Sequence, residues 1–254
     1  MKLLLSLTLL FTAVAHSIYA SEKELSVSCK ILTPTEVKYS KVDALKIVAS
    51  DKHATIISFE HLPKESEVHI KVERPLLREI PSEKDKKYHQ EFFFTSDGLM
   101  LTSESLQNDK PCFLLTSDGY LPGEEVKIYF ECNGYKSKPL VHTPQPIKLK
   151  SRVDGACIKI KLKDLISGNY QFEFVGFQPK EKIKFTSTNC GEVISGEHTT
   201  NNGLALMCGV VGFKGGLDRI KFTRGNGEVL EVTLPWGTEL LGYLTGEKKT
   251  PVTR

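Results

Sequence analysis

The chain has 254 residues, of which 26% are charged, and its 34 basic residues nearly balance its 31 acidic ones to give a formal net charge of +3. A balance this close to neutrality gives no electrostatic argument for binding nucleic acid or an anionic membrane surface. The length is sufficient for one to three domains with a sizeable hydrophobic core.

Residues 1–20, MKLLLSLTLLFTAVAHSIYA, have the features of a secretory signal peptide. Lys2 precedes an apolar stretch at residues 3–14, and small residues follow. The apolar stretch is shorter than the ~20 residues that a membrane-spanning helix needs, which favours cleavage, after Ala20, over anchoring. We therefore expect a secreted or periplasmic protein that has no membrane span after cleavage.

Beyond the signal, the chain is a series of short segments with the apolar–polar alternation of β-strands, bounded by Gly, Pro, Asn and Asp. This pattern predicts an all-β fold with antiparallel sheets packed as sandwiches. Residues 21–105 are expected to form an N-terminal β domain and residues 106–240 a C-terminal β region. The charged stretch 75–88 is predicted as a solvated loop, and residues 241–254 as a disordered tail.

One short element recurs. It reads GYLPGEEVKIYF at residues 119–130 and GFQPKEKIKF at residues 176–185, with a weaker copy, HLPKESEVHIK, at residues 61–71. The prolines of the three copies lie 59 and 57 positions apart. These spacings predict that residues 106–240 comprise two units of about 57 residues, although Gly and Pro also recur as punctuation between the strands of any β protein.

Six cysteines follow the predicted cleavage site, and an even number behind an export signal favours disulfide bonds. If the chain folds back around residues 121–123, two of them would face each other on neighbouring strands, and another two would close a glycine-rich loop. The predicted pairs are Cys112–Cys132, Cys190–Cys208 and Cys29–Cys157. Buried free thiols are the alternative, since Cys packs well as a small hydrophobic residue.

The sequence contains no HExxH, GxSxG, P-loop or dinucleotide-binding glycine motif. Cys208 lies beside glycines in LMCGVVG and could act as a nucleophile with His198 as its base, but a half-cystine or core thiol is the simpler interpretation. His53, His61 and His69 could meet across strands and hold Zn²⁺, but single imidazoles on polar strand faces are again simpler. No metal or cofactor is expected.

The candidate binding residues are three aromatic side chains. Trp236, the only tryptophan, lies in Pro-Trp-Gly after the last predicted strand, where it could cover the end of a core or stack on a ligand. Tyr120 and Phe177 hold equivalent places in the repeated element, where they could anchor loops to the core or contact a ligand.

The repeated element, with the pattern G-[FY]-x-P-x-E-x-[VI]-K-[IF], resembles the entry to an early strand in bacterial immunoglobulin-like modules of exported proteins. SGNYQF at residues 167–172 is similar to a later strand of such modules. The resemblance extends over about residues 111–235 and implies tandem small Ig-like sandwich units. The short spacing departs from it, since an Ig domain has about 100 residues, so either the units are minimal sandwiches or two domains are built from three units.

The sequence thus predicts an exported β-sandwich protein that binds a protein or glycan in the cell envelope or outside the cell. One alternative is an exported cysteine-dependent hydrolase or transpeptidase that uses Cys208 and His198. A further alternative is a periplasmic assembly chaperone, of which an exposed edge strand open to strand addition is expected.

Overall fold

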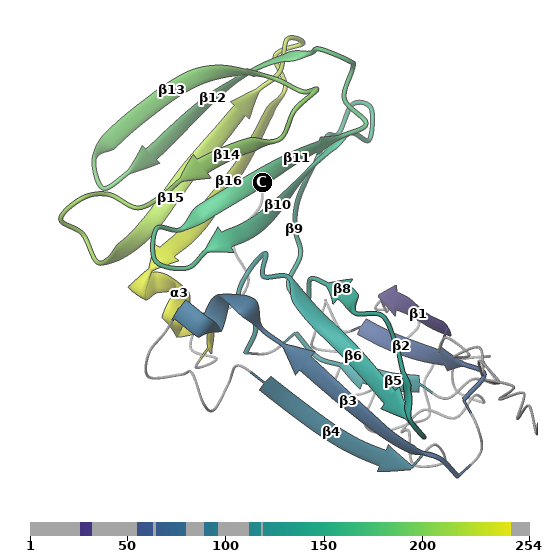
Figure 1. The fold of residues 1–254 in the computed structure, drawn as a ribbon. Coiled ribbons are helices and arrows are strands. Elements are labelled where there is room, and N and C mark those ends of the chain that lie inside the picture. The colour runs from purple at the N-terminus through teal and green to yellow at the C-terminus, as the bar shows by residue number, and fades with distance from the viewer. Residues whose placement is uncertain are drawn as a thin grey trace, which may run out of the picture.

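The computed structural model describes residues 26–31, 55–62, 65–79, 89–95, 112–117 and 119–244. Within these residues the strands form four antiparallel sheets that pack in two pairs, which are the lower and upper parts of the molecule in Figure 1. The predicted all-β class is therefore confirmed. The predicted signal peptide, residues 1–20, lies outside the described residues.

The first sandwich packs a three-stranded sheet against a five-stranded sheet. The smaller sheet has the order β1 (Ser26–Ile31), β2 (Thr55–Glu60), β5 (Cys112–Leu115). The larger has the order β4 (His89–Thr95), β3 (Glu67–Glu73), β6 (Val126–Cys132), β7 (Tyr135–Lys136), and β8 (Leu140–His142) also pairs with β6. Phe59 of β2 meets Phe130 of β6 edge to face, with ring centroids 4.8 Å apart, so the two sheets share one core.

The second sandwich packs two four-stranded sheets. One has the order β14 (Leu204–Met207), β11 (Asn169–Val175), β10 (Cys157–Asp164), β9 (Ile147–Lys150). The other has the order β13 (Glu192–Thr199), β12 (Lys182–Asn189), β15 (Gly215–Thr223), β16 (Val229–Gly237). Phe172 and Phe222 join the sheets across the core, with centroids 5.2 Å apart.

The two sandwiches have the same topology. In chain order and in pairing, β1, β2 and β5 correspond to β10, β11 and β14, and β4, β3 and β6 correspond to β13, β12 and β15. The copies at 61–71 and 176–185 therefore lead into equivalent strands, β3 and β12, whereas the copy at 119–130 leads into β6. The internal repeat is a whole sandwich, about twice the predicted 57 residues, because the same entry turn is used before more than one strand of a sandwich.

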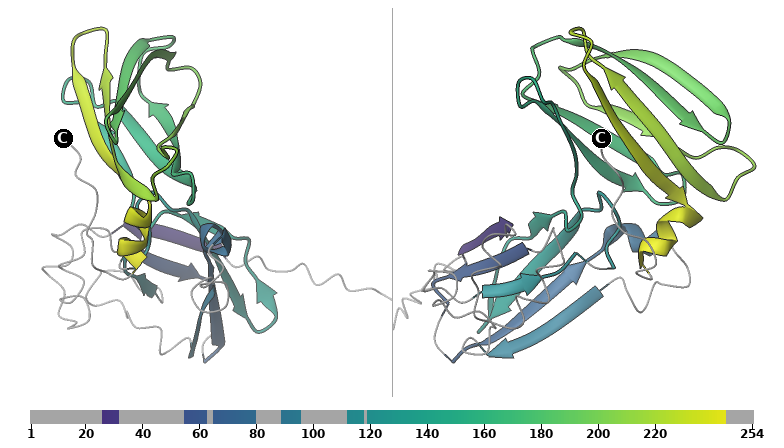
Figure 2. Two further views of the ribbon diagram at one scale, coloured as in Figure 1. Left: turned by 90° about the vertical axis from the view of Figure 1, so that its left-hand side faces the viewer. Right: turned by 180° about the vertical axis from the view of Figure 1, so that it is seen from behind.

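The predicted domain boundary after residue 105 does not separate the two sandwiches. β5 pairs with β2 and β6 pairs with β3, so residues 112–142 belong with the N-terminal strands, and the chain passes to the second sandwich between β8 and β9. Sequence spacing could not show this, because the partners of β5 and β6 are remote in the chain. Figure 2 shows the two sandwiches from two further sides.

A glycine joins the two sandwiches. The carbonyl oxygen of Gly123 accepts a hydrogen bond from the N–H of Leu162 at 2.9 Å, and its own N–H donates to the carbonyl of Gln145 at 2.8 Å. Gly123 has φ +75, and a Cβ there would lie 3.0 Å from the carbonyl oxygen of Ile160. Only glycine fits this close approach. Glu125, two residues on, forms ion pairs with Lys161 and Lys163 of β10.

The predicted disulfides are wrong for the described thiols. Cys112 and Cys132 are not the hairpin neighbours that were predicted, because β5 pairs with β2 in one sheet and β6 pairs with β3 in the other. Cys190 is exposed in a turn, whereas Cys208 is buried in the second core. For the third predicted pair, Cys29–Cys157, the two residues lie in different sandwiches: Cys29 is on β1, and Cys157, a free thiol, is on β10. The alternative of free thiols therefore holds for Cys132, Cys157, Cys190 and Cys208.

Two helices replace predicted irregular segments. Residues 75–79 of the predicted loop form a 3₁₀-helix, η1 (Pro75–Glu79), whose Leu76 and Leu77 are buried against the second core. The predicted tail begins as α3 (Thr238–Leu244), which is anchored by buried Leu240 and Tyr243, while residues 245–254 lie outside the described residues. In the described part of the chain, neither helix has the length and apolar character that crossing a bilayer requires.

Candidate functional site

The hairpin of β12 and β13 forms one side of the second sandwich. Its two strands pair without a bulge from Lys182↔Thr199 to Asn189↔Glu192. The connection is the two residues Cys190 and Gly191, both with positive φ (48 and 86). This is the mirror-image turn whose twist suits a tight hairpin. The hairpin is therefore regular along its whole length.

The outer edge of β13 is open. Among the described residues β13 is hydrogen-bonded to β12 alone, and in Figure 1 it lies at the outside of the second sandwich. Proteins usually protect such edges with short strands, Pro, charged side chains, especially Lys, or bulges. β13 has no Pro, Lys or bulge: its eight residues read EVISGEHT and keep one register throughout. Its charged side chains are Glu192 and Glu197, and Glu197 forms an ion pair with Lys182 of the neighbouring strand β12. The edges at β9 and β14, in contrast, are four residues long.

The geometry of the turn determines which backbone groups of β13 face outward. In a two-residue hairpin the residues that flank the turn exchange both hydrogen bonds, and the direction alternates thereafter. Since Glu192 flanks the turn, the even-numbered residues of β13 face β12. The N–H and C=O groups of Val193, Ser195 and Glu197 and the N–H of Thr199 therefore point away from the sheet, where another strand could bind them. The C=O of Thr199 accepts a hydrogen bond from the N–H of Asn202 at 3.4 Å.

The side chains of β13 are exposed on both faces. Ile194 pairs with the core-facing Ser187 of β12, yet it is 57% exposed, and Val193 on the other face is 65% exposed. The opposite sheet explains this, because its edge strand β14 is short, and its inward Leu204 and Leu206 are only half-buried. The core is thus incompletely covered along the side where β13 and β14 lie.

This open side ends in a group of exposed apolar residues. The turn after β14 is closed by a hydrogen bond from the N–H of Phe213 to the carbonyl of Val210 at 3.2 Å, with Gly212 at φ +89, and it leaves Val211 99% exposed. The N–H of Gly209 donates to the carbonyl of Ser167 at 2.8 Å, which fixes the loop beside the turn that carries Ile166. We call these residues the apolar end: Ile166, Val193, Ile194, Met207, Val211, Phe213 and Leu217.

A buried polar network holds this end in place. The indole N–H of Trp236 donates to Oδ1 of Asn189 at 3.1 Å, and Nδ2 of Asn189 donates to the carbonyl of Cys208. The network ties the end of β16, the end of β12 and the start of the exposed loop together. Because buried and satisfied networks rigidify their surroundings, the apolar residues are displayed on a fixed framework.

None of the predicted aromatic binding residues is exposed at the apolar end. Trp236 is 2% exposed and Tyr120 is buried in the first core, so neither can contact a ligand, and their core alternatives hold. Phe177 is half-buried, with the guanidinium carbon of Arg224 4.6 Å from its ring centroid, and anchors its loop. They form no common surface, since Tyr120 packs in the first core and the other two pack on the second.

The predicted catalytic pair is not brought together. Cys208 lies beside Asp218, and burial together with this carboxylate raises the pKa of the Cys208 thiol well above its usual range, the opposite of an activated nucleophile. The His198 ring stacks on Phe174, and His198 lies opposite Ile183 in the register of β12 and β13. Cys208 is at the other end of β12, where its carbonyl accepts a hydrogen bond from Asn189, about 20 Å along the strand from Ile183. The cysteine-nucleophile alternative is therefore wrong for this arrangement.

The predicted zinc alternative also finds no support. His53 lies outside the described residues, His61 is exposed in a turn, and His69 is on β3. In the part of the chain that the structure describes, no group of three His, Cys, Asp or Glu side chains could hold a metal ion.

Comparison of the chain with protein-family models and with curated proteins finds no match. Among solved structures, the chain is similar to "Crystal structure of tetra-tandem repeat in extending region of large adhesion protein", with 9% sequence identity and a TM-score of 0.24. The similarity covers 84% of this chain and 49% of that chain, so the chain spans about half the length of that structure. A TM-score this low does not establish a common fold.

Proposed function

We propose that this protein is an exported binding module that takes up an extended segment of a partner protein as an additional strand beside β13. One observation carries the proposal: an eight-residue strand without bulge, Pro or Lys is open along its edge and ends among exposed apolar residues. Strand addition uses main-chain hydrogen bonds for affinity and alternate side chains for specificity. β13 offers outward main-chain groups at four alternate positions.

The side-chain environment indicates which segment would fit. On the core-facing side, an added strand would lie beside exposed Ile194 and half-buried Leu204 and Leu206, which favours apolar residues at alternate positions. On the other side it would meet Ser195 and Glu197, which favour polar or basic residues. At β13 a protein partner is preferred to a glycan, because the outward N–H and C=O groups of the strand match the hydrogen-bonding groups of another backbone.

The place of action rests on the sequence of residues 1–20, which favours export to the periplasm or the cell exterior. A periplasmic assembly chaperone is the second candidate. The feature that favours it is the same open edge strand, since holding an extended segment of a subunit is one use of strand addition.

A proline at position 195 is expected to abolish strand addition and leave the hairpin intact. The N–H of Ser195 faces outward, so Ser195→Pro removes a backbone hydrogen bond to the added strand and no backbone hydrogen bond to β12, and edge strands tolerate proline at such positions. The exposed hydrogen bond between the hydroxyls of Ser195 and Thr186, at 3.2 Å, is lost in Ser195→Ala as well. Peptides selected from a random library for binding to the purified protein should bind Ser195→Pro about 10-fold more weakly or worse. Fluorescence polarisation measures this.

Ser195→Ala is the matched control, because it keeps the N–H, and its affinity should stay within about twofold. Hydrogen exchange supplies a second measurement, in which the amides of residues 193, 195, 197 and 199 become protected when peptide binds. Peptides that bind Ser195→Pro as well as the wild type, or that protect amides elsewhere, would disprove edge addition. Unchanged circular dichroism confirms that both variants are folded.

A further inference from the structure

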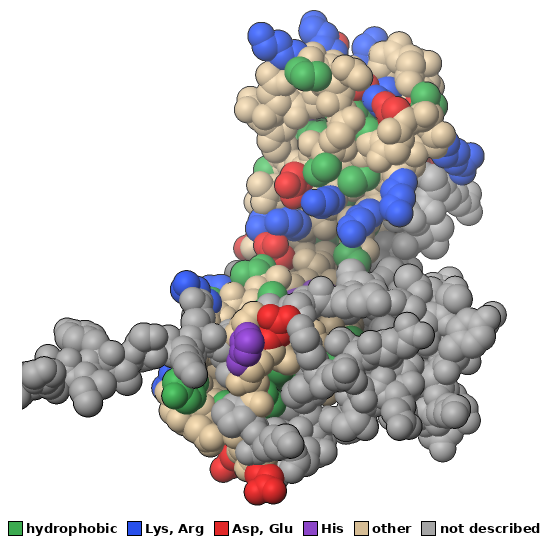
Figure 3. Space-filling view, turned by 90° about the vertical axis from the view of Figure 1, so that its right-hand side faces the viewer, with side chains coloured by type: hydrophobic (Ala, Val, Ile, Leu, Met, Phe, Trp, Pro, Cys, Tyr) green, Lys and Arg blue, Asp and Glu red, His purple; other side chains and the backbone are tan. Residues whose placement is uncertain are grey.

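The outward face of β9 carries a strip of basic residues at the opposite side of the second sandwich from β13. Lys148 and Lys150 alternate with the buried Ile147 and Leu149, and both are exposed. Arg152 follows in the turn after β9, and Lys159 of β10 lies directly opposite Lys148 in the register of the two strands. We call Lys148, Lys150, Arg152 and Lys159 the basic strip. Figure 3 shows Lys and Arg side chains spread over this sandwich.

The charges of the strip have no partner among the described residues. In the described residues none of its four side chains forms an ion pair or a hydrogen bond. On the other sheet, in contrast, Lys182 pairs with Glu197, and Arg219 and Lys221 both pair with Glu231. Like charges directly opposite each other on neighbouring strands are destabilising, so the Lys148–Lys159 pair costs stability in the free protein.

Protection of an edge by lysine is a competing explanation, and it accounts for Lys148 and Lys150 on the edge strand β9. It does not account for Lys159, which lies on an inner strand between β9 and β11. Nor does it account for Arg152, which lies beyond the strand and borders a hollow. Glu173 faces Lys159 from β11, but its carboxylate lies 3.9 Å from Lys161.

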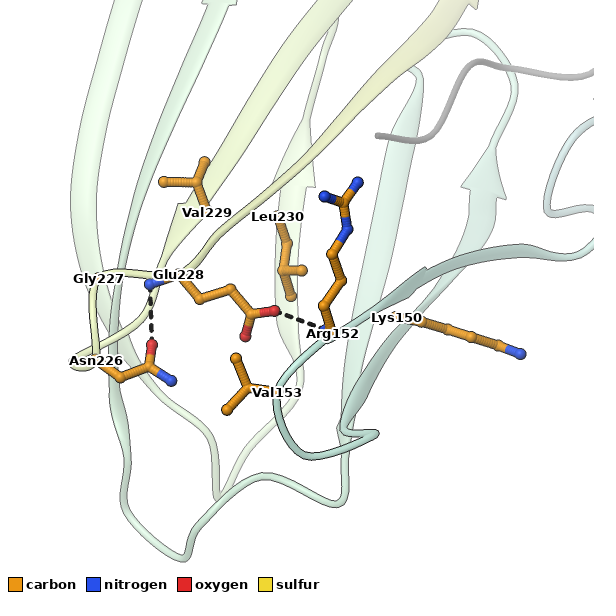
Figure 4. Close-up of a pocket in the computed structure, with 8 residues that line it drawn as sticks. All are labelled: Lys150, Arg152, Val153, Asn226, Gly227, Glu228, Val229 and Leu230. Carbon is orange, nitrogen blue, oxygen red and sulfur yellow. Dashed lines mark hydrogen bonds between the residues drawn. The ribbon is translucent and has the colours of Figure 1, made fainter.

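The hollow lies between the β9–β10 turn and the β15–β16 turn, with a volume of about 510 Å³. Figure 4 shows Val153 and Val229 on two of its sides, with the Arg152 side chain beside Leu230 and Lys150 directed away from it. Glu228 also borders it, but its carboxylate accepts hydrogen bonds from the N–H of Arg152 and from Ser151 and Arg224. The one carboxylate of the lining is therefore compensated, and Arg152 remains available to an anion.

We propose that the basic strip and the hollow bind a linear anionic polysaccharide, with the strip facing its carboxylates or sulfates and the hollow accepting a sugar ring. The volume is in the range of small-molecule sites and exceeds what a single acidic side chain needs. Exposed valines beside Arg152 and Asn226 suit a ring with an apolar face and a hydroxylated rim. The lining contains no aromatic side chain for stacking nucleic-acid bases. This proposal does not depend on strand addition at β13.

Binding of oligogalacturonate to the full mature chain tests this proposal, measured by isothermal titration calorimetry at about 50 and 150 mM salt. Lys148→Gln/Lys150→Gln/Arg152→Gln is expected to weaken binding about 10-fold or more and to flatten its salt dependence, because these side chains would displace counterions. The matched control, Lys182→Gln/Lys184→Gln/Lys221→Gln, removes the same charge from the other sheet and should change binding by less than about twofold.

Three further ligands test whether the site recognises sugar rings or only negative charge. Dextran should not bind, and polyglutamate and oligothymidylate should bind at least about 10-fold more weakly than oligogalacturonate. The proposal is overturned if oligogalacturonate does not bind at the lower salt concentration, if the control triple variant loses as much affinity as the strip variant, or if polyglutamate or oligothymidylate binds equally well. Ser195→Pro should leave this affinity unchanged.

Discussion

Replacing Arg74 by methionine is expected to lower the free energy of unfolding of the first sandwich by about 3–5 kcal/mol, because it leaves a buried carboxylate without its partner. Nε and Nη2 of Arg74 donate to the two oxygens of Glu124 at 3.0 and 2.7 Å, and the two side chains are 3% and 0% exposed. The guanidinium also lies over the Tyr120 ring, with its carbon 4.5 Å from the centroid. The pair connects the end of β3 with the loop before β6.

The double variant Arg74→Met/Glu124→Gln should recover more than half of this loss, since no charge is then buried, and the glutamine oxygen can still accept the hydrogen bond from the N–H of Leu121. Guanidinium unfolding followed by circular dichroism measures the change. Trp236 fluorescence provides the control, because the only tryptophan lies in the second sandwich and its transition should move less. Additive losses in the double variant would mean that the two side chains stabilise the fold independently.

The structure shows what two copies of the repeated element do: each binds a buried arginine. In the copy at 119–130, Tyr120 lies under the guanidinium of Arg74, and Glu124 forms an ion pair with it. In the copy at 176–185, Phe177 lies under Arg224, and Glu181 forms the ion pair. Sequence alone could identify the aromatic residue and the glutamate as a recurrent pair of positions. It could not supply the arginines, which come from the ends of β3 and β15, because sheet pairing is not encoded in local spacing.

The same limit explains which parts of the fold were predictable. Strands with one buried face, such as β6 and β10, alternate clearly and can be located from their sequence. β13 cannot be located in this way because both of its faces are exposed, so EVISGEHT has no alternation to detect. The turn before it, Asn189-Cys190-Gly191, was the available signal, since Gly after a short polar segment favours a tight hairpin. The exposure of both faces of β13 therefore makes the strand available to a partner and also removes the sequence pattern by which it could be predicted.

Replacing Arg224 by methionine is expected to destabilise the second sandwich by about 3–5 kcal/mol at pH 7, since three carboxylates lose their shared partner. Arg224 is 5% exposed and binds Asp154 of the β9–β10 turn, Glu181 before β12 and Glu228 before β16, at 2.8, 2.8 and 3.1 Å. Its hydrogen bonds lower the pKa values of Asp154 and Glu181. Burial opposes a low pKa at Glu228, but the N–H of Arg152, Ser151 and Arg224 together lower it.

These lowered pKa values fix the pH dependence of the effect. A carboxylate with a lower pKa in the folded state contributes stability that is present above its unfolded pKa, about 4, and is lost as the pH falls through the folded pKa. The wild type should therefore lose stability below about pH 4.5. Without Arg224 the three carboxylates repel one another and bind protons more readily when folded, so the variant should gain stability as the pH falls from 7 to 4. Urea unfolding followed by Trp236 fluorescence measures both curves, and a difference between them that stays constant over this range would show that Arg224 acts through packing on Phe177 alone.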